Sequence, residues 1–392
     1  MPLGMRRPNY RKLREIHDTQ GPERLKTFMQ EAFREKLMHH SEFSIRELAE
    51  ETVDYGDEWV RAMTPGKGQQ LYEAGAVNSA AFATITGQVY YNAVLEGYMD
   101  EQFVFSPLIP TTNTNILNGE KIAGLQRIGD EAEIVDESMP YPLVGLGEDW
   151  IQTPASVKRG MICAITAEAI TADTTGKVLD HGREVGYWLG VNKEKRAIDT
   201  VIDENTTTGR LNWRGTSYAT YQATTPWINI QASNALVDWT DVENLKILFS
   251  NMTDPWTGEP VVIGRTGLKL VCTDALEFTA LRIRNATEIT VVTPGYATSG
   301  NPTETRVANP VQGMFDVTSS ALLAARLGTD TSWFLGKPER AFKYMSVWDM
   351  SVTQAPPNSE ADFERDVIFR MRARERGAFT TVNPRYMAKA TA

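Results

Sequence analysis

One stretch of the chain, residues 174–205, limits the possible folds more than any other, because its sequence predicts a single long helix. Asp173 and Thr174 offer side-chain oxygens to the first free N–H groups, and no proline interrupts the stretch. At about 1.5 Å per residue this helix would span roughly 45 Å, which is long for a globular domain. Apolar residues recur along it at helical spacing: Val178, Val185, Trp188, Leu189, Ile198, Val201 and Ile202.

Three glycines, Gly182, Gly186 and Gly190, lie four residues apart and therefore on one face of this helix. Each costs a helix up to ~1 kcal/mol relative to alanine. Three in register indicate that another backbone passes close by, so we interpret them as helix-packing sites. The alternative interpretation is a buried helix of an α/β enzyme.

The composition is typical of a globular protein. Hydrophobic residues make up 42% of the 392 residues. No apolar run reaches the ~18 residues that a membrane span needs, and residues 1–15 lack the apolar core of a secretory signal. The two cysteines, Cys163 and Cys272, provide no disulfide framework, so we expect a protein that folds in a cytoplasm and has no membrane partner.

The charge is distributed unevenly. The whole chain carries −10, yet residues 1–40 hold nine lysines and arginines against five acidic residues. Such a basic segment is either a contact for nucleic acid or a solvated helix face. The candidate nucleic-acid-facing residues are Arg6, Arg7, Arg11, Lys12 and Arg14.

Two helices are expected in this segment, at residues 8–20 and 22–40, because Gly21 and Pro22 end one helix and begin the next. A capping box at residues 44–47 predicts a third helix, and residues 78–99 return to helix after a polar linker. The second helix has one apolar stripe, which needs a partner to cover it: Leu25, Phe28, Met29, Phe33 and Leu37.

Residues 107–156 are rich in glycine and proline and contain two strand-like pieces, at 121–128 and 148–153. A connection of this length without a core of its own is uncommon and is usually functional or disordered. A two-stranded ribbon is barely stable alone, so we expect it to lie on something else. Between the two pieces is an acidic tip: Asp130, Glu131, Glu133, Asp136 and Glu137.

Further along, helices and strands alternate, which predicts an α/β unit at residues 236–345. A strand at 157–166 precedes the long helix. The expected elements of the α/β unit are a helix at 241–252 capped by Thr240, strands at 261–263 and 268–272, a helix from Thr273 or Asp274 to 286, a strand at 289–292, a polar loop at 295–309 and a helix at 319–327.

Near the end of the chain, residues 366–376 alternate with a period of two, which predicts a strand. One face would be apolar, and the other would carry an arginine row: Arg370, Arg372 and Arg374. One interpretation is an edge strand with a solvated, charged face. The other is a docking row for carboxylates, which arginine binds in bidentate fashion.

Catalytic patterns are missing from the sequence. The histidines are His17, His39, His40 and His181, and no metalloprotease, phosphate-loop, nucleophile-elbow or paired-cysteine zinc motif is present. We therefore predict no catalytic, cofactor-binding or metal-binding residue and interpret Cys163 and Cys272 as core residues. A site made of two carboxylates stays open as an alternative, because its partners need not be close in sequence.

Several segments together resemble the major capsid protein of tailed bacteriophages, whose fold is shared with encapsulins. The resemblance spans roughly residues 78–392, and its motifs are structural rather than catalytic. It points to the branch of Mu-like head subunits. The segments that carry it, besides residues 107–156, are GKVLDHGREVGYWLGVNKEKRAID, VDWTDVENLKILFSNMTDPWTGEP, RIRNATE, TSWFLGKPERAFKYM and QAPPNSEADFERDVIFRMRARERGA.

The resemblance implies an α+β fold of the tailed-phage major capsid type, with an N-terminal arm, an extended loop, a peripheral domain and an axial domain. The implied bounds are 1–77 for the helical arm, 78–106 for a helix leading into the body, 107–156 for the extended loop, 157–235 for the peripheral domain with its spine helix at 174–205, 236–345 for the axial domain and 346–392 for closing strands of the peripheral domain.

In function, the resemblance implies a structural protein that self-assembles, as hexamers and pentamers, into the icosahedral shell around double-stranded DNA. No cofactor and no enzyme activity are implied. Further partners would be a portal protein and, as candidates, scaffold or decoration proteins. The protein would reside in the virion and, before assembly, in the host cytoplasm. Copies of the chain would cover the unpartnered ribbon and arm, and the acidic tip of one copy would meet the arginine row of the next.

Two alternatives remain open on the sequence. An encapsulin-type nanocompartment shares the fold, but encapsulins in general lack a long basic arm. A soluble α/β enzyme with an acidic-pair site belongs to another class and would form only small oligomers.

Overall fold

The computed structural model describes residues 8–52, 80–125, 135–139, 149–166, 177–203, 211–254, 258–261, 263–264, 266–293, 303–355 and 367–392. The chain divides into two compact units. Unit 1 consists of Met1–Phe103, Lys158–Lys193 and Trp348–Arg376, and unit 2 of Val104–Val157, Glu194–Val347 and Gly377–Ala392. Both units mix helices and strands, which confirms the expected α+β class.

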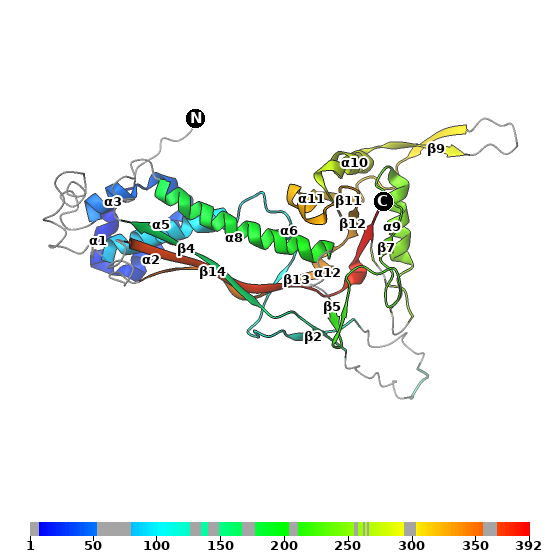
Figure 1. Cartoon of the computed structure of the whole chain (residues 1–392), viewed down its shortest axis with the longest axis horizontal. Coiled ribbons are helices and arrows are strands. Elements are labelled where there is room, and N and C mark those ends of the chain that lie inside the picture. The colour runs from blue at the N-terminus through cyan, green and yellow to red at the C-terminus, as the bar shows by residue number, and fades with distance from the viewer. Residues whose placement is uncertain are drawn as a thin grey trace. The chain divides into compact units, whose positions relative to one another are not determined.

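Unit 1 packs a group of helices against strands. Figure 1 shows the helices of residues 10–52 gathered beside α5. In the sheet, β14 lies between β13 and β4. The elements of the unit are α1 (Tyr10–Gln20), α2 (Pro22–Arg34), the 3₁₀ turn η1 (His40–Glu42), α3 (Ile45–Thr52), α5 (Ala80–Tyr98), β4 (Val157–Thr166), and parts of α8 (Lys177–Ile202), β13 (Phe342–Gln354) and β14 (Val367–Thr381).

The long helix expected at residues 174–205 is confirmed as α8, which begins at Lys177 and ends at Ile202. Residues 174–176 and 204–205 lie outside the described residues. The strand expected at 157–166 is confirmed as β4 with the same bounds. The apolar residues of α8 recur at helical spacing, which local sequence alone can specify.

Helix α5 lies against the glycine face of α8 so closely that backbone meets backbone. A Cβ on Gly186 of α8 would overlap the carbonyl oxygen of Val94, and a Cβ on Gly97 of α5 would overlap the carbonyl oxygen of Arg183. Each helix therefore presents a glycine to the other. A larger residue at either position would push the two backbones apart.

The other two glycines of the same face lie against aromatic rings. A Cβ on Gly182 would come within 2.8 Å of the Tyr90 ring, and a Cβ on Gly190 would overlap the ring of Phe103. The interior is packed as densely as an organic crystal, so such an overlap forces a shift of the neighbouring ring or helix.

The N-terminal helices are covered by their own chain. Leu25 and Met29 of α2 are fully buried in one cluster with Phe82 and Ile85 of α5. Our expectation that other copies cover the whole apolar stripe is therefore wrong for these two residues, because α5 presents an apolar face within the same unit. Leu37, at the far end of the stripe, is 71% exposed.

In unit 2, the base of segment 107–156 belongs to a sheet. β2 (Lys121–Ala123) pairs antiparallel with β3 (Trp150–Gln152), so both strand-like pieces are confirmed, although they are shorter than expected. β3 pairs in turn with β5 (Leu211–Trp213), and β5 pairs with β6 (Thr216–Tyr218). Two further elements are described near the start of the segment: α6 (Phe105–Leu108) and β1 (Thr111–Asn113), which pairs parallel with β13.

This four-stranded sheet has a small core made of Leu125, Ile151, Leu211 and Trp227. The expectation of a segment without a core of its own is thus wrong at its base. The completing strands, β5 and β6, come from the chain after α8, and no local pattern in 107–156 indicates them.

A five-stranded sheet forms the main layer of unit 2, in the order β11-β8-β12-β15-β7. The outer pairs β11–β8 and β15–β7 are parallel, while β12 is antiparallel to both of its neighbours. Its strands are β7 (Ile230–Gln231), β8 (Leu268–Cys272), β11 (Phe315–Ser319), β12 (Trp333–Gly336) and β15 (Met387–Ala390). The remaining elements are α9 (Trp239–Ser250), α10 (Asp274–Asn285), β9 (Glu288–Thr293), β10 (Thr303–Ala308), α11 (Ala321–Leu327), α12 (Pro338–Ala341) and the 3₁₀ turn η2 (Pro384–Tyr386).

Helix α9 begins earlier than expected, and Thr240 is not its cap. The carboxylate of Asp238 accepts from the backbone N–H of Thr240, and the carboxylate of Asp241 accepts from the N–H of Asp238. Asp238 therefore provides the N-cap of a reciprocal capping box. Helix α10 begins at Asp274 with Thr273 as N-cap residue, as one of the two options expected.

Two other expectations for this region are wrong. Val261 and Ile263 are buried but form no strand, so their apolar character serves the core. The loop expected at 295–309 contains β10, which pairs antiparallel with β9. Its β-branched residues, Thr303, Thr305 and Val307, favour a strand, whereas the expectation rested on the polarity of the whole segment.

Replacing Gly186 by leucine is expected to lower the free energy of unfolding by about 1–3 kcal/mol, because the side chain has no room between α8 and the Val94 carbonyl. The control is Trp188→Leu on the same helix, since Trp188 is 55% exposed. That control should change the free energy by no more than about 0.5 kcal/mol. Chemical denaturation measures the free energy of unfolding of both variants. Wild-type stability of Gly186→Leu would contradict the close contact between α8 and α5.

Candidate functional site

The arginine row of β14 has the alternation expected from the sequence. Met371 and Ala373 are buried in the core of unit 1, while Arg370, Arg372 and Arg374 are half-buried on the opposite face. The period of two is confirmed over these positions. It arises because successive side chains of a strand point to opposite faces of the sheet.

The interpretation of β14 as an edge strand is wrong, because β14 lies between β13 and β4. The guanidinium of Arg374 lies 5.1 Å from the ring centroid of Trp348, a cation–π contact across to β13. The Nε atoms of Arg372 and Arg374 are buried and have no hydrogen-bond partner among the described residues. Because these two atoms are closed to an incoming group, they do not bear on the docking of carboxylates, which stays a prediction.

The edge of this sheet in unit 1 is β4, and it exposes apolar side chains. Met161 and Ile162 are 41% and 61% exposed. A long edge strand with apolar residues is a ready template for association with another chain. This feature is typical of a surface that becomes buried in an assembly.

Only part of the acidic tip can be placed. Asp136 and Glu137 are described, and both are exposed in unit 2. Asp130, Glu131 and Glu133 lie outside the described residues.

A buried ion pair fixes the base of the segment that carries this tip. Arg385 donates from Nη1 to Asp254 Oδ2 at 2.8 Å and from Nη2 to the carbonyl oxygen of Leu125 at 2.9 Å. The side chains of Arg385 and Asp254 are only 3% and 2% exposed. The hydrogen bond to Leu125 therefore ties the chain that leads from β2 toward the acidic tip to this buried pair.

The basic residues of the arm lie on exposed helix faces. Arg11 faces Glu51 at 3.5 Å with 84% of its side chain exposed, and Arg14 lies 3.7 Å from Asp18 one turn on. Lys12 is also exposed, while Arg6 and Arg7 lie outside the described residues. Exposed pairs of this kind contribute about 0–1 kcal/mol, so these side chains can exchange partners easily.

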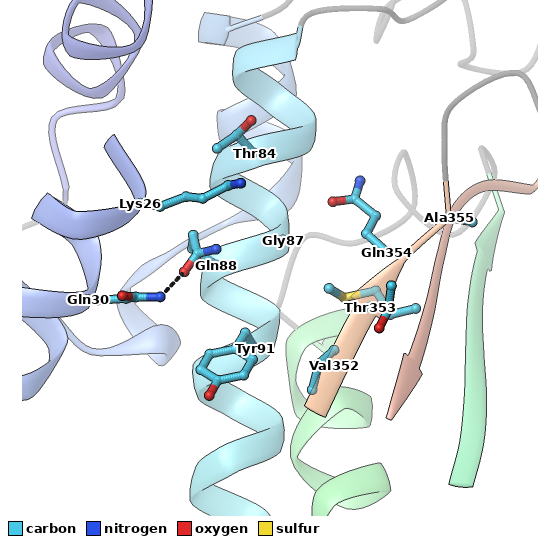
Figure 2. Close-up of a pocket in the computed structure, with 11 residues that line it drawn as sticks. Lys26, Gln30, Thr84, Gly87, Gln88, Tyr91, Val352, Thr353, Gln354 and Ala355 are labelled. Atoms are coloured by element: carbon cyan, nitrogen blue, oxygen red, sulfur yellow. Dashed lines mark hydrogen bonds between the residues drawn. The ribbon is translucent and has the colours of Figure 1, made fainter. Parts of the chain in front are cut away.

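A cavity of about 670 Å³ lies in unit 1, between α2, α5 and β13. Figure 2 shows the residues that line it. Gln30 of α2 donates to Gln88 of α5 at one side of it. Its lining, as far as the chain is described, contains no carboxylate, histidine or cysteine. The cavity therefore offers no pair of acids. The lining residues are Lys26, Gln30, Thr84, Gly87, Gln88, Tyr91, Val352, Thr353, Gln354, Ala355 and Met371.

The cysteines are core residues, as expected. Cys272 is fully buried in β8, and burial, assisted by the nearby carboxylates of Glu277 and Asp274, raises the pKa of its thiol to about 12. Cys163 is half-buried and packs against the core of unit 1. A thiol with a pKa so far above neutral stays protonated and is a poor nucleophile.

One cluster of titratable side chains was not expected from the sequence. His39, His40 and Glu96 bring three potential ligand atoms within 4.8 Å of one another. His39 and His40 belong to the turn at η1, and Glu96 lies in the last part of α5. The adjacent histidines were a signal, but only the fold shows which carboxylate joins them.

Comparison with known proteins decides the family. Residues 151–390 match the model of the family described as phage capsid protein, which covers more than half of the chain. The chain belongs to the phage capsid protein family. The expected role as a capsid shell protein is thereby confirmed, and the encapsulin alternative is not favoured. The assignment to the Mu-like branch stays a prediction.

Solved structures with a similar arrangement also come from capsids and related particles. A virus-like particle from Pyrococcus furiosus aligns with 9% identity and a TM-score of 0.41, over 78% of this chain and 99% of that chain. The capsid of cyanophage P-SCSP1u aligns with 11% identity and a TM-score of 0.43, over 74% and 88%. Mycobacterium phage Che8 aligns with 14% identity and a TM-score of 0.39, over 74% and 91%. No curated protein matches the chain.

Across the described part of this capsid protein, no helix combines the length and the apolar character needed to cross a membrane.

Replacing Asp254 by asparagine is expected to destabilise the capsid protein by about 3–5 kcal/mol, because it leaves the buried guanidinium of Arg385 without its counter-charge. The matched control is Asp316→Asn, which removes the exposed partner of Arg284 at the same 2.8 Å distance. That change should cost less than about 1 kcal/mol. Urea denaturation measures the free energy of unfolding of both variants. Equal losses of stability would show that the buried pair of Arg385 and Asp254 does not hold the base of segment 107–156.

Proposed function

We propose that this capsid protein is the major subunit of a tailed-phage head. Hexamers and pentamers of the chain would form a closed icosahedral shell around double-stranded DNA. The observation that carries the proposal is the family match over residues 151–390. The role is structural and needs neither a catalytic residue nor a cofactor.

The surfaces of the two units support association with further copies. Unit 1 exposes the apolar edge strand β4, and the half-buried arginine row lies on the neighbouring strand β14. Contacts between different patches of identical subunits close into rings when the rotation between subunits allows it. Such heterologous contacts are what a hexamer or a pentamer requires.

The domain assignment follows from the same proposal. The arm is residues 1–77, residues 78–106 lead into the body, residues 107–156 are the extended loop, and residues 236–345 are the axial domain. Residues 157–235 and 346–392 form the peripheral domain, with α8 as its spine. The buried pair of Arg385 and Asp254 supports an extended loop that is anchored at its base and free to reach a neighbouring copy.

The charge pattern suggests how neighbouring copies meet. The acidic tip of one copy would lie on the arginine row of the next, where guanidinium groups bind carboxylates in bidentate fashion. A single exposed pair is worth only about 0–1 kcal/mol. The same contact repeats at every equivalent interface of a shell, so its effect on assembly is larger than its effect on one subunit.

The arm would face the packaged genome. Its exposed cations, Arg11 and Lys12 among them, can neutralise phosphates without reading sequence. The protein would reside in the virion after a passage through the host cytoplasm. A portal protein and scaffold or decoration proteins are the further partners that such a shell uses.

Reversing Glu131 and Glu133 to lysine is expected to weaken shells while the subunit stays folded, because like charges would then meet at the arginine row. Sedimentation velocity should show a smaller fraction of particles, and raised salt should reduce the wild-type fraction in the same way. Circular dichroism checks the fold of each variant.

The control is Glu101→Lys combined with Asp330→Lys, which reverses two exposed acidic residues elsewhere and changes the net charge equally. This control should assemble like the wild type. Equal particle fractions for the tip variant and the wild type would contradict the proposed contact, and small oligomers from the wild type itself would contradict the proposed function.

A further inference from the structure

The cluster of His39, His40 and Glu96 has the composition of a metal site. His39 Nε2 lies 3.3 Å from Glu96 Oε2, and His40 Nδ1 lies 2.8 Å from the same oxygen. The two imidazole rings are 4.3 Å apart between centroids. Imidazole nitrogen and carboxylate oxygen are ligands that zinc and its neighbours in the first transition row accept.

The distances fit a tetrahedral ion. Zinc binds nitrogen and oxygen at about 2.0–2.2 Å, so two ligand atoms of a tetrahedral site lie roughly 3.3 Å apart. The His39–Glu96 distance has this value. The shorter His40–Glu96 distance is that of a hydrogen bond, which lengthens when an ion replaces the shared proton. Three protein ligands leave the fourth position for water.

His40 is the buried member of the cluster. Its side chain is only 6% exposed. Burial lowers the pKa of this imidazole, while Glu96 acts in the opposite direction and His39 and Arg183 add to the lowering. The proton that His40 Nδ1 shares with Glu96 has to leave this nitrogen when an ion binds there.

The orientation of His39 is set by Ser41. Its Nδ1 accepts from the backbone N–H of Ser41 at 3.3 Å and lies 2.7 Å from Ser41 Oγ. With Nδ1 accepting, Nε2 carries the ring proton and faces Glu96. When an ion binds Nε2, the proton moves to Nδ1, which then donates to Ser41 Oγ. A metal-bound histidine generally donates its other ring N–H to such an acceptor, and the acceptor fixes the ring in place.

Helix α8 adds two further charges near the cluster. Arg183 Nε lies 3.9 Å from Glu96 Oε1, so it engages the oxygen that does not face the histidines. The positive charge of Arg183 disfavours a bound cation. The negative charge of Asp180 acts in the opposite sense and favours a positive charge near His40. The carboxylate of Glu96 thus has one oxygen for the ion and the other for the arginine.

We propose that His39, His40 and Glu96 bind one divalent ion of the zinc class, with Ser41 positioning His39. The ion joins the turn at η1 to α5 and thereby fastens the N-terminal helices within unit 1. Ion binding is a property of the single subunit and does not depend on shell assembly.

The test is a titration of Zn²⁺ into the metal-free full chain, measured by isothermal titration calorimetry. The absorption spectrum of the chain with Co²⁺ then reports whether the ion is bound tetrahedrally. One ion per chain is expected. His39→Ala and Glu96→Gln should each weaken Zn²⁺ binding at least tenfold and abolish the tetrahedral Co²⁺ spectrum. Ser41→Ala should weaken binding about tenfold while keeping that spectrum.

The matched control is His181→Ala, which removes a histidine that lies 3.5 Å from Glu184 without a second histidine. It should bind Zn²⁺ like the wild type. Wild-type affinity of His39→Ala, or an equal loss in His181→Ala, overturns the site. His39 is half exposed, so its alanine variant should keep the fold, and circular dichroism in the presence of a chelator verifies this.

Discussion

The contact between α5 and α8 is the constraint on which unit 1 depends. Gly97 and Gly186 lie where each helix meets a carbonyl of the other, so the two backbones touch without intervening side chains. The opposite face of α5 buries Leu25 and Met29 of the N-terminal segment. At the end of α5, Tyr98 donates to the buried carboxylate of Glu375 on β14 at 2.6 Å. Helix α5 is therefore the element that contacts α8, the N-terminal helices and the sheet of unit 1.

Unit 2 is held by buried polar groups as well as by its apolar layers. The carboxylate of Glu194 accepts from the backbone N–H groups of Val104, Phe105 and Ser106, which begins α6. The amide of Asn229 donates to three carbonyl groups, including that of Met387 in β15. Satisfied buried networks of this kind specify one arrangement, because each unpaired member would cost about 1–3 kcal/mol.

The sequence predicted those features that depend on local pattern. Most of α8 follows from the helical spacing of its apolar residues, and the spacing of Gly182, Gly186 and Gly190 indicated a close neighbour. The arginine alternation of β14 was likewise visible. The identity of that neighbour, α5, was not predictable, because helical spacing shows which face is packed but not what packs against it.

The errors have the same physical origin. The base of segment 107–156 gains its core from Leu211 and Trp227, which lie beyond α8 in the sequence. β14 proved to be an inner strand because β4 pairs beside it, and a strand's own pattern does not reveal its neighbours. Glu96 joins His39 and His40 only through the packing of η1 on α5. Contacts between distant residues decide all three cases.

The most direct measurement is electron microscopy of the purified full chain under conditions in which circular dichroism shows a folded subunit. Closed shells of uniform diameter, with pentamers and hexamers resolved in their surface, are the result expected of a major capsid subunit. A folded chain that remains monomeric or forms only small oligomers, at every salt concentration and with portal and scaffold proteins supplied, would contradict that role.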